Sequence, residues 1–499
     1  MAVYNYTIYG QNTIFRYSKI EVMEKITGRI DEIKTLQGAL RSKHAELIAI
    51  YGRRRVGKTF LVHNYYQKQL AFELTGMYSG TLKEQLQQFS KSFEKATKSP
   101  LSVKAPENWI KAFNALEIYL DTKNKKEKWV IFLDEFPWLD GRKSGFLSAF
   151  EHFWNTWASR QPNAIVIICG SAASWMIKNI VNNKGGLHNR ITQKIRLLPF
   201  TLTETEQFLK SQKIKLDRYQ ILQIYMAFGG IPQYLKNIQR GKSASQVIEK
   251  TCFSKDGLLT GEFNNLYSSL FEIADNHLKV VRALAKTTKG LTRQEIIDTC
   301  KLSSGGRTTE MLEELEESGF IKSMPSFEKN SNDGIFRLID EYSIFYLKFM
   351  DKTNAEGKDI WGKISSGLSY KIWCGMAFEA VCLKHVDLIK KGLEITVKTQ
   401  ESTWRHLPKK GEKDTGAQID LVIDRDDKSI NLCEMKFYDK EFQIDKAYSK
   451  IIEQKINVFA GQTKTKKAIF LTMVSTYGVK ENIYSSMIQN SLTMDILFE

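Results

Sequence analysis

LIAIYGRRRVGKT, residues 47–59, decides the fold of this 499-residue chain. Its first five residues, Leu47–Tyr51, are apolar and include β-branched isoleucine, which is typical of a strand buried on both faces of a parallel sheet. The remaining eight follow the pattern G-x-x-x-x-G-K-T, and a helical pattern continues after them. The stretch therefore predicts a strand, a glycine-rich turn and a helix, which together make an anion-binding loop.

The turn Gly52–Thr59 has the residue types that phosphate binding requires. Gly52 and Gly57 allow the backbone to wrap close to an anion and to aim its N–H groups at it. Lys58 can place a charge against the β- and γ-phosphates, and Thr59 offers a hydroxyl to Mg²⁺. The alternative, a glycine turn beside solvated basic residues, does not explain the strand and helix on either side. We predict that ATP with magnesium is bound by Gly52, Arg53, Arg54, Arg55, Val56, Gly57, Lys58, Thr59 and Phe60.

Two later strands end in polar residues that suit the same site. Trp129–Leu133 is followed by Asp134 and Glu135, and the run Ile165–Cys169 is followed closely by Ser171. At the carboxyl end of a parallel strand, an Asp can hold Mg²⁺ through water, and the adjacent Glu can orient or activate the attacking water. Ser171 is predicted to sense the γ-phosphate, with a strand-end cap as the alternative.

These motifs resemble those of the archaeal-type ATPases of the AAA/STAND group. The G-R-x-x-E box of that family is matched by Gly28–Glu32, and its helical-lid motif by Gly229–Pro232. The resemblance implies that Arg190, ahead of the run Ile195–Phe200, senses phosphate in its own subunit or in a neighbour's site. In place of the family's Pro-Leu-Tyr-Gly before this arginine, the chain has GLHN at 186–189. The resemblance spans roughly Gly28 to the chain end, and its most specific part is the arginine-rich P-loop.

Short apolar runs alternate with longer amphipathic segments, which predicts an α/β fold with a parallel sheet flanked by helices. The predicted architecture is a P-loop NTPase sheet with a helical lid, then a winged helix, then a restriction-endonuclease-like α/β domain. The predicted parts are an N-terminal extension (1–27), the ATPase core (28–200), the helical lid (201–275), the winged-helix domain (276–352) and the nuclease-like domain (353–499). The polar stretch Asp351–Lys358 is the predicted linker to the last part.

Three helical patterns and two extended runs in 276–352 are typical of a winged helix. The candidate recognition helix begins after Gly306, with Arg307, Thr308 and Thr309 in its first turn, where side chains could reach phosphates or base edges in a major groove. The helix is also strongly acidic, which repels DNA, through Glu310, Glu313, Glu314, Glu316 and Glu317. We therefore favour a domain that packs between its neighbours, with Thr308 capping the helix.

Two runs near the C-terminus, 416–423 and 432–436, resemble the core of PD-(D/E)XK nucleases. Adjacent strands can bring Asp420 and Glu434 together to bind a divalent metal, and Lys436 projects from the same strand face to position or polarise water. Glu379 matches the family's upstream acid, which can add a ligand, and oxygen ligands suit Mg²⁺ or Mn²⁺. The alternative is a strand pair with solvated charges, and a nuclease fold can also survive as a binding module.

Composition limits the partners and the compartment. A net charge of +17, from 73 Lys+Arg and 56 Asp+Glu, favours nucleic acid or another polyanion as a partner. The six cysteines form no C-x-x-C pair, which excludes an obvious zinc site or redox dithiol and fits a reducing compartment. The N-terminus does not resemble a signal peptide, and no apolar run approaches the ~18 residues that span a bilayer. We therefore expect a cytoplasmic protein without a membrane partner.

These features favour an ATP-driven switch in which nucleotide state controls the C-terminal domain, with nucleic acid as its ligand. A competing hypothesis is a nucleotide-dependent regulatory or scaffold ATPase that acts through a protein partner and whose C-terminal domain does not cleave. A sequence-specific DNA-binding regulator is a third possibility, and the acidic helix argues against it. A monomer, a dimer and a ring are all compatible with the motifs.

Overall fold

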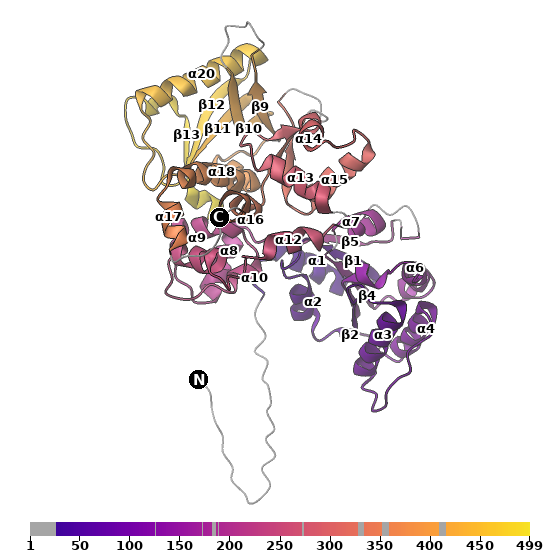
Figure 1. The fold of residues 1–499 in the computed structure, drawn as a ribbon. Helices are drawn as coiled ribbons and strands as arrows, with labels where there is room; N and C mark the ends of the chain where they lie inside the picture. Colours follow the sequence, from indigo (N-terminus) through magenta and orange to yellow (C-terminus); the bar gives the residue numbers. More distant parts are fainter. Residues whose placement is uncertain are drawn as a thin grey trace, which may run out of the picture.

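The computed structural model describes residues 26–124, 126–171, 173–181, 186–187, 189–271, 274–327, 334–351, 359–408 and 416–499. All but the last two residues of the predicted N-terminal extension lie outside these ranges, as do His188 of the GLHN run and nearly all of the predicted linker, 352–358. In Figure 1 the first part of the chain, in indigo and violet, lies at the lower right, and the C-terminal part, in yellow, lies at the top.

A five-stranded sheet organises the first part of the chain. Its strands are β1 (Glu46–Tyr51), β2 (Leu70–Thr75), β3 (Trp129–Asp134), β4 (Ala164–Gly170) and β5 (Gln193–Arg196). They run parallel in the order β2-β3-β4-β1-β5. Side chains alternate between two cores: Ile48 and Ile50 join one core, and Leu47 and Ala49 join the other. The predicted parallel sheet, buried on both faces, is therefore confirmed, and β2 is a strand that the sequence patterns did not indicate.

Helices cover both faces of this sheet. The face with Ile48 packs on α1 (Ile30–Arg41) and α2 (Lys58–Tyr66), and the opposite face packs on α3 (Leu82–Thr97), α4 (Trp109–Asp121) and α6 (Phe146–Thr156). The short elements of this part are α5 (Phe136–Leu139), η1 (Ala158–Arg160), α7 (Ala173–Met176) and η2 (Ile177–Val181).

In the described residues of the predicted lid, the regular elements are all helices. They are α8 (Leu202–Ser211), α9 (Arg218–Phe228), α10 (Pro232–Leu235), α11 (Ala244–Ile248), η3 (Glu249–Phe253) and α12 (Glu262–Ser268). A capping box of Thr201 and Glu204 begins α8. Gly229, with a φ of 69°, ends α9, and Pro232 begins α10. The chain therefore turns at Gly229–Pro232, the run that matches the helical-lid motif.

The middle segment combines helices with a small antiparallel sheet. Its elements are α13 (Ala274–Leu284), β6 (Leu291–Thr292), α14 (Arg293–Cys300), α15 (Gly306–Glu317), β7 (Ile321–Met324) and β8 (Ile335–Leu338), with strand order β6-β8-β7. The proposed cap of α15 was wrong: Gly305 is the N-cap, and the buried Thr308 donates its hydroxyl to the carbonyl of Ser303 at 2.6 Å. Thr308 is therefore turned inward, away from any ligand at the helix surface.

The last part builds a mixed sheet in the order β13-β12-β11-β10-β9. The strands are β9 (Thr399–His406), β10 (Ala417–Arg425), β11 (Ser429–Lys436), β12 (Ala468–Ser475) and β13 (Asn490–Thr493). Helices α16 (Glu341–Phe345) and η5 (Tyr346–Met350) come before this part, and its own helices are α17 (Ile360–Ser365), α18 (Leu368–Lys384), α19 (Val386–Gly392), α20 (Lys446–Thr463), η6 (Ser485–Met487) and η7 (Met494–Phe498). Packing places α18 and α20 on opposite faces, since Leu421 shares a core with α18, and Val422 shares one with Phe459 of α20.

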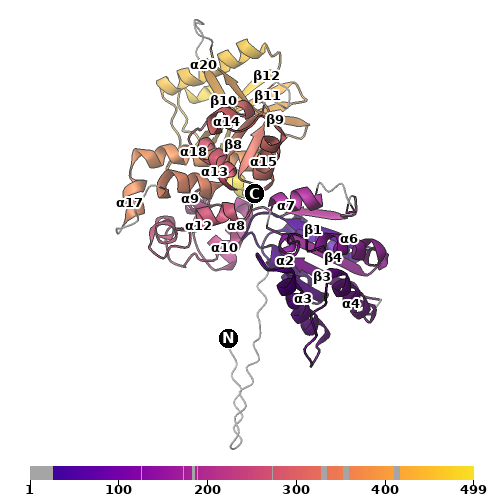
Figure 2. The same ribbon diagram turned by 45° about the vertical axis from the view of Figure 1, so that its right-hand side comes forward.

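The three later parts of the chain pack together closely. One continuous core joins residues of α1, the lid, the middle segment and α18. In both ribbon views, α13 and α15 lie between the parallel sheet and the C-terminal sheet (Figures 1 and 2). Arg196 at the end of β5 donates to the carbonyl of Glu317 at 2.8 Å, and Lys322 of β7 donates to the carbonyl of Leu383 at 2.8 Å. The middle segment therefore contacts both of its neighbours.

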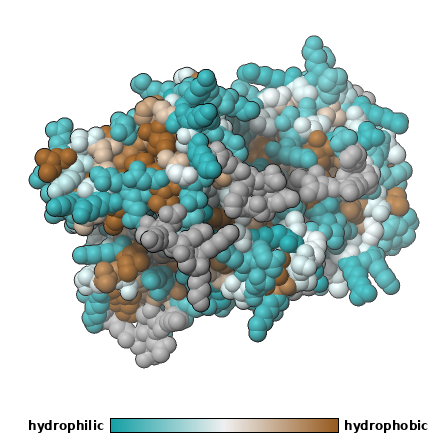
Figure 3. Space-filling model, turned by 90° about the horizontal axis from the view of Figure 1, so that it is seen from above, coloured by the Kyte–Doolittle hydropathy of each residue, from teal (hydrophilic) through white to brown (hydrophobic). Residues whose placement is uncertain are grey.

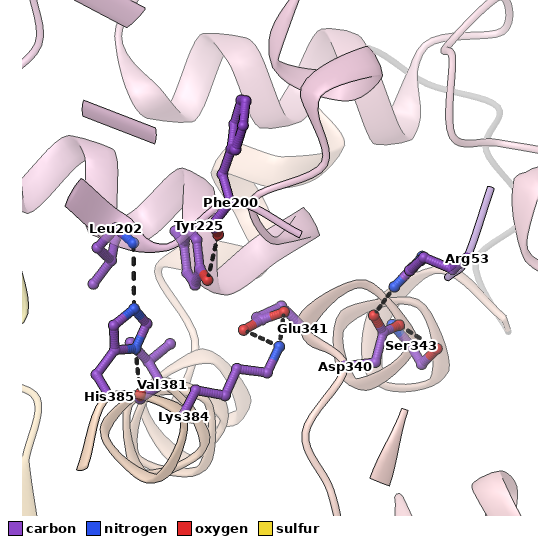
Figure 4. Close-up of polar contacts among 10 residues, drawn as sticks. All are labelled: Arg53, Phe200, Leu202, Tyr225, Asp340, Glu341, Ser343, Val381, Lys384 and His385. Carbon is purple, nitrogen blue, oxygen red and sulfur yellow. Dashed lines mark hydrogen bonds and ion pairs between the residues drawn. The ribbon is translucent and has the colours of Figure 1, made fainter. Parts of the chain in front are cut away.

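The imidazole of His385 joins α18 to the start of the lid (Figure 4). Its Nε2 accepts from the backbone N–H of Leu202 at 3.2 Å, and its Nδ1 lies 2.8 Å from the carbonyl of Val381. Because Leu202 donates to Nε2, the proton of the neutral ring belongs on Nδ1. Burial lowers the pKa of His385 to about 4, so the neutral ring is the form that the fold requires.

We expect stability to fall as pH is lowered from about 6.5 to about 4. The unfolded chain binds a proton at His385 near pH 6.5, but the folded chain binds it only near pH 4. The stability contributed by the neutral ring is therefore complete above pH 6.5 and is lost as the pH falls towards 4. The free energy of unfolding is expected to fall by about 3 kcal/mol over this range. Denaturant unfolding across this range would test it beside His385→Gln, which keeps an acceptor and a donor but does not titrate. Equal losses of stability in the two proteins would contradict this role.

The surface seen from above the C-terminal sheet is mostly hydrophilic, with smaller hydrophobic areas gathered mainly on one side (Figure 3). Within the described ranges, no helix is long and apolar enough to cross a membrane. All six cysteines are buried as free thiols.

Candidate functional site

The glycine-rich turn holds two unusual backbone conformations. Gly57 has a φ of 93° and Gly52 a φ of 146°, both in the region that favours glycine. A Cβ on Gly52 would stand 2.3 Å from the carbonyl oxygen of Leu197, so only glycine fits where this turn passes β5. Around a Cβ on Gly57, by contrast, no described atom lies within 4 Å. The turn is therefore braced on one side and open on the other, which is the shape that a phosphate-binding cradle needs.

Lys58 is held by the turn itself. Its ammonium group donates to the carbonyls of Gly52 and Arg53, both at 2.9 Å, and its side chain is almost fully buried. Burial lowers the pKa of Lys58, and the nearby Cys169, Glu135 and Asp134 oppose that shift. An anion in the cradle would compete with the two carbonyls for this ammonium group.

The residues predicted to surround magnesium and the attacking water meet at the end of the sheet. The hydroxyl of Thr59 donates to Asp134 Oδ2 at 2.7 Å, so both oxygens stand where one cation could contact them. Glu135 Oε2 accepts from the hydroxyl of Ser171 at 2.7 Å and from its backbone N–H at 3.3 Å. Residues from α2, β3 and the end of β4 thus form one cluster, and hydroxyl and carboxylate oxygens are ligands that Mg²⁺ prefers.

Two of the three P-loop arginines, which are predicted to bind nucleotide, pair with protein carboxylates. Arg53 is 2% exposed and forms an ion pair with Asp340 at the start of α16 (Figure 4). Arg55 pairs with Glu262 of α12 at 2.9 Å, and Arg54 is exposed. The guanidinium groups of Arg53 and Arg55 therefore pair with the carboxylates of Asp340 and Glu262 in this arrangement. Neither carboxylate partner follows a sequence pattern that distinguishes it from other acids.

Arg190 is exposed, whereas Arg29 is buried against the P-loop. Arg190 is in an exposed turn before β5, and its side chain forms no hydrogen bond or ion pair with any described residue. Arg29, from the GRIDE run, is buried and donates to the carbonyl of Val56 at 3.1 Å while covering the ring of Phe200. Through Arg29, the run Gly28–Glu32 therefore supports the backbone of the P-loop. Arg190 has no hydrogen bond or ion pair with the described residues of the cluster.

The predicted C-terminal residues lie at one end of the mixed sheet. The antiparallel register pairs Leu421 of β10 with Cys433 of β11, so Asp420 and Glu434 occupy the next positions of that ladder. Lys436 lies on the same strand face as Glu434, and the two charged groups are 3.8 Å apart. Glu379 of α18 lines a cavity of about 310 Å³ together with Asp420.

Basic side chains pair with these acids. Asp420 Oδ1 accepts from Arg337 of β8 at 2.7 Å and from the amide of Gln418 at 2.9 Å. Lys455 of α20 donates to Glu434 Oε1, and Tyr448 donates to its other oxygen at 3.1 Å. Burial acts to raise the pKa of Asp420, but Arg337 and Gln418 outweigh it and the pKa lies below its ordinary value.

The pKa of the third acid, Glu379, shifts in the opposite direction to that of Asp420. Burial, with Asp420 nearby, raises the pKa of Glu379 to about 8, so this carboxyl is mainly protonated at neutral pH. Across the described ranges, no group of three or more His, Cys, Asp or Glu side chains is arranged to hold a metal ion. The predicted metal set of Glu379, Asp420 and Glu434 lies in one neighbourhood, where arginine and lysine neutralise two of the acids.

Comparison with known proteins is informative for the first part of the chain. Residues 27–238 match the model of a family described as an ATPase domain predominantly from Archaea. An uncharacterized protein of Methanocaldococcus jannaschii is 26% identical over 426 residues, which cover 84% of this chain and 89% of that protein.

Two solved structures are also similar. A Walker-type ATPase of Pyrococcus abyssi has a TM-score of 0.47 and 18% identity, covering 64% of this chain and 96% of that one. The ORC2 protein of Aeropyrum pernix, in its ADPNP and ADP complexes, has a TM-score of 0.43 and 15% identity, covering 70% of this chain and 98% of that one. The family match and the P-loop geometry agree, and they identify residues 27–238 as a P-loop domain of the nucleotide-binding ATPase type.

Proposed function

We propose that this protein is an ATP-binding and ATP-hydrolysing switch whose nucleotide state controls its C-terminal domain, which acts on nucleic acid. The observation that carries the ATPase half is the convergence of Thr59, Asp134, Glu135 and Ser171 beside the open cradle at Gly57. The proposed division is an ATPase core (28–200), a helical lid (201–275), a winged-helix domain (276–352) and a nuclease-like domain (353–499).

Each residue of the cluster has a proposed role. Lys58 contacts the β- and γ-phosphates after leaving the carbonyls that it now contacts. Thr59 and Asp134 hold Mg²⁺, which when bound neutralises charge on the phosphates. Glu135 takes the proton of the attacking water, and Ser171 fixes the orientation of that carboxylate. Arg190, exposed before β5, reaches phosphate in its own site or in that of a neighbouring copy.

The C-terminal half of the proposal is carried by Asp420, Glu434, Lys436 and Glu379, which gather from β10, β11 and α18. The cavity beside them is also lined by Lys289 and Lys455, and the chain has an excess of basic residues, which favours a phosphodiester ligand.

The competing function is a regulatory or scaffold ATPase whose C-terminal domain binds without cleaving. The pairing of Asp420 with Arg337 and of Glu434 with Lys455 favours it, because these cations stand where a metal would be needed. The contacts of the middle segment with both neighbours also suit a scaffold.

A cleavage assay separates these functions. If the C-terminal domain is a nuclease, single- or double-stranded DNA or RNA will be cut with Mg²⁺ or Mn²⁺, and Asp420→Ala will abolish cutting. Asp424→Ala is the matched control, since Asp424 lies on the same strand but pairs with Lys467 outside the cluster. Running the assay with and without ATP shows the direction of control. Cutting that survives in Asp420→Ala would exclude this site, and no cutting on any substrate would favour the scaffold ATPase.

A further inference from the structure

Five consecutive residues join the two candidate sites. They are Arg337–Glu341, from the end of β8 to the start of α16, and are called here the connecting segment. Arg337 pairs with Asp420 of the C-terminal cluster, Asp340 pairs with Arg53 of the P-loop, and Glu341 pairs with Lys384 of α18. Figure 4 shows the last two pairs, with Asp340 and Glu341 at the start of α16. The three acidic or basic groups of the segment are each at most 6% exposed.

At the β8 end of the segment, Arg337 contacts the C-terminal acid cluster. Its guanidinium contacts Asp420 at 2.7 Å and lies near Glu379, and both acids line the 310 Å³ cavity. A divalent cation that used Oδ1 of Asp420 would compete with this guanidinium for that oxygen.

At the P-loop end, Arg53 is only partly satisfied. One of its nitrogens pairs with Asp340, its guanidinium lies over the ring of Phe320, and its Nε and Nη2 donate to no acceptor among the described residues. The carbonyl of the same residue accepts from Lys58. A phosphate that recruits Lys58 removes that bond, so nucleotide binding acts directly on the residue that holds Asp340.

The connecting segment is short and its backbone is held by hydrogen bonds, so it has little freedom to take up a displacement of Asp340 within itself. Arg337 and Asp340 are three residues apart, which spans at most about 11 Å of chain. Backbone N–H groups of Ile339 and Asp340 both donate to the carbonyl of Phe320, at 2.9 and 3.1 Å. Asp340 also accepts from the backbone N–H of Ser343 at 2.9 Å, which fixes the start of α16. The short backbone between them therefore couples the position of Asp340 to that of Arg337.

We propose that Arg337 is a gate on the C-terminal acid cluster and that the connecting segment links this gate to the P-loop, so that nucleotide binding loosens the contact between Arg337 and Asp420. The inference rests on the proposed function, because it requires that the P-loop binds nucleotide. It extends that function by naming the residues through which the first half of the chain regulates the second. Linkage makes the effect reciprocal, so breaking the gate contact must change nucleotide affinity at the distant P-loop.

The test measures the affinity of the full chain for a fluorescent ATP analogue, mant-ATP, by titrating the protein with mant-ATP in the presence of Mg²⁺. Arg337→Gln removes the charge of the gate, and we expect mant-ATP to bind at least about five-fold more tightly, the lower end of typical coupling between sites. Asp420→Asn weakens the same contact from the other side and is expected to act in the same direction if Arg337→Gln folds poorly. Lys467→Gln is the matched control, because Lys467 pairs with Asp424 of the same strand but touches neither end of the segment.

The route is tested by repeating Arg337→Gln in the background Arg53→Met/Asp340→Asn, where the segment no longer pairs with the P-loop. The tightening caused by Arg337→Gln is expected to vanish there. Affinities of Arg337→Gln and Asp420→Asn equal to that of the wild type would overturn the gate, as would an equal tightening in Lys467→Gln. A wild-type chain that bound no mant-ATP would instead overturn the proposed function, so the two failures are distinguishable.

Discussion

Replacing Glu135 with Gln is expected to leave ATP binding intact and to lower the rate of hydrolysis about 10²–10⁴-fold, the usual contribution of a positioned general base. The amide of Gln keeps the shape of the side chain and can still accept from Ser171, but it cannot take a proton from water. Phosphate release measured at saturating ATP gives the rate, and mant-ATP titration confirms that binding is retained.

The matched comparison is Lys58→Ala. That variant removes the only lysine of the cradle and is expected to lose nucleotide binding itself, so its defect appears in affinity rather than in rate alone. Hydrolysis by Glu135→Gln at the wild-type rate would show that another group activates the water.

The second large effect concerns the buried pair of Arg53 and Asp340. Their side chains are 2% and 3% exposed, so removing either partner leaves a charge without compensation in the protein interior. We expect Arg53→Met and Asp340→Asn each to lower the free energy of unfolding by about 3–5 kcal/mol. The Asn still accepts from Ser343, which keeps the start of α16 in place and limits the change to the charge.

The double variant Arg53→Met/Asp340→Asn is expected to be more stable than the sum of the single changes predicts, because it leaves no buried charge unpaired. Denaturant unfolding of the four proteins gives this double-mutant cycle. Additive losses would mean that the pair contributes little and that each residue acts through other contacts.

Much of the first half of the chain is readable without coordinates. The run Leu47–Thr59 predicts a strand, a turn and a helix from local chemistry alone, and β1 and α2 form there. Strand ends at Asp134 and Ser171 could be assigned to one edge because parallel strands share their carboxyl ends. In the C-terminal part, the predicted runs 416–423 and 432–436 overlap β10 and β11. Helix α18 runs from Leu368 to Lys384, and its residues are too uniform in polarity to mark either end.

The sequence by itself determined the phosphate cradle, the acids beside it and the alternation of strands and helices, because each follows from residue types at short, fixed spacings. Only the tertiary structure decided which cation faces which acid. Arg53 and Asp340 are 287 positions apart and Arg337 and Asp420 are 83 apart, and no periodicity encodes either pairing. Such contacts form because packing buries particular charges side by side, where each must find a partner or be expelled from the core.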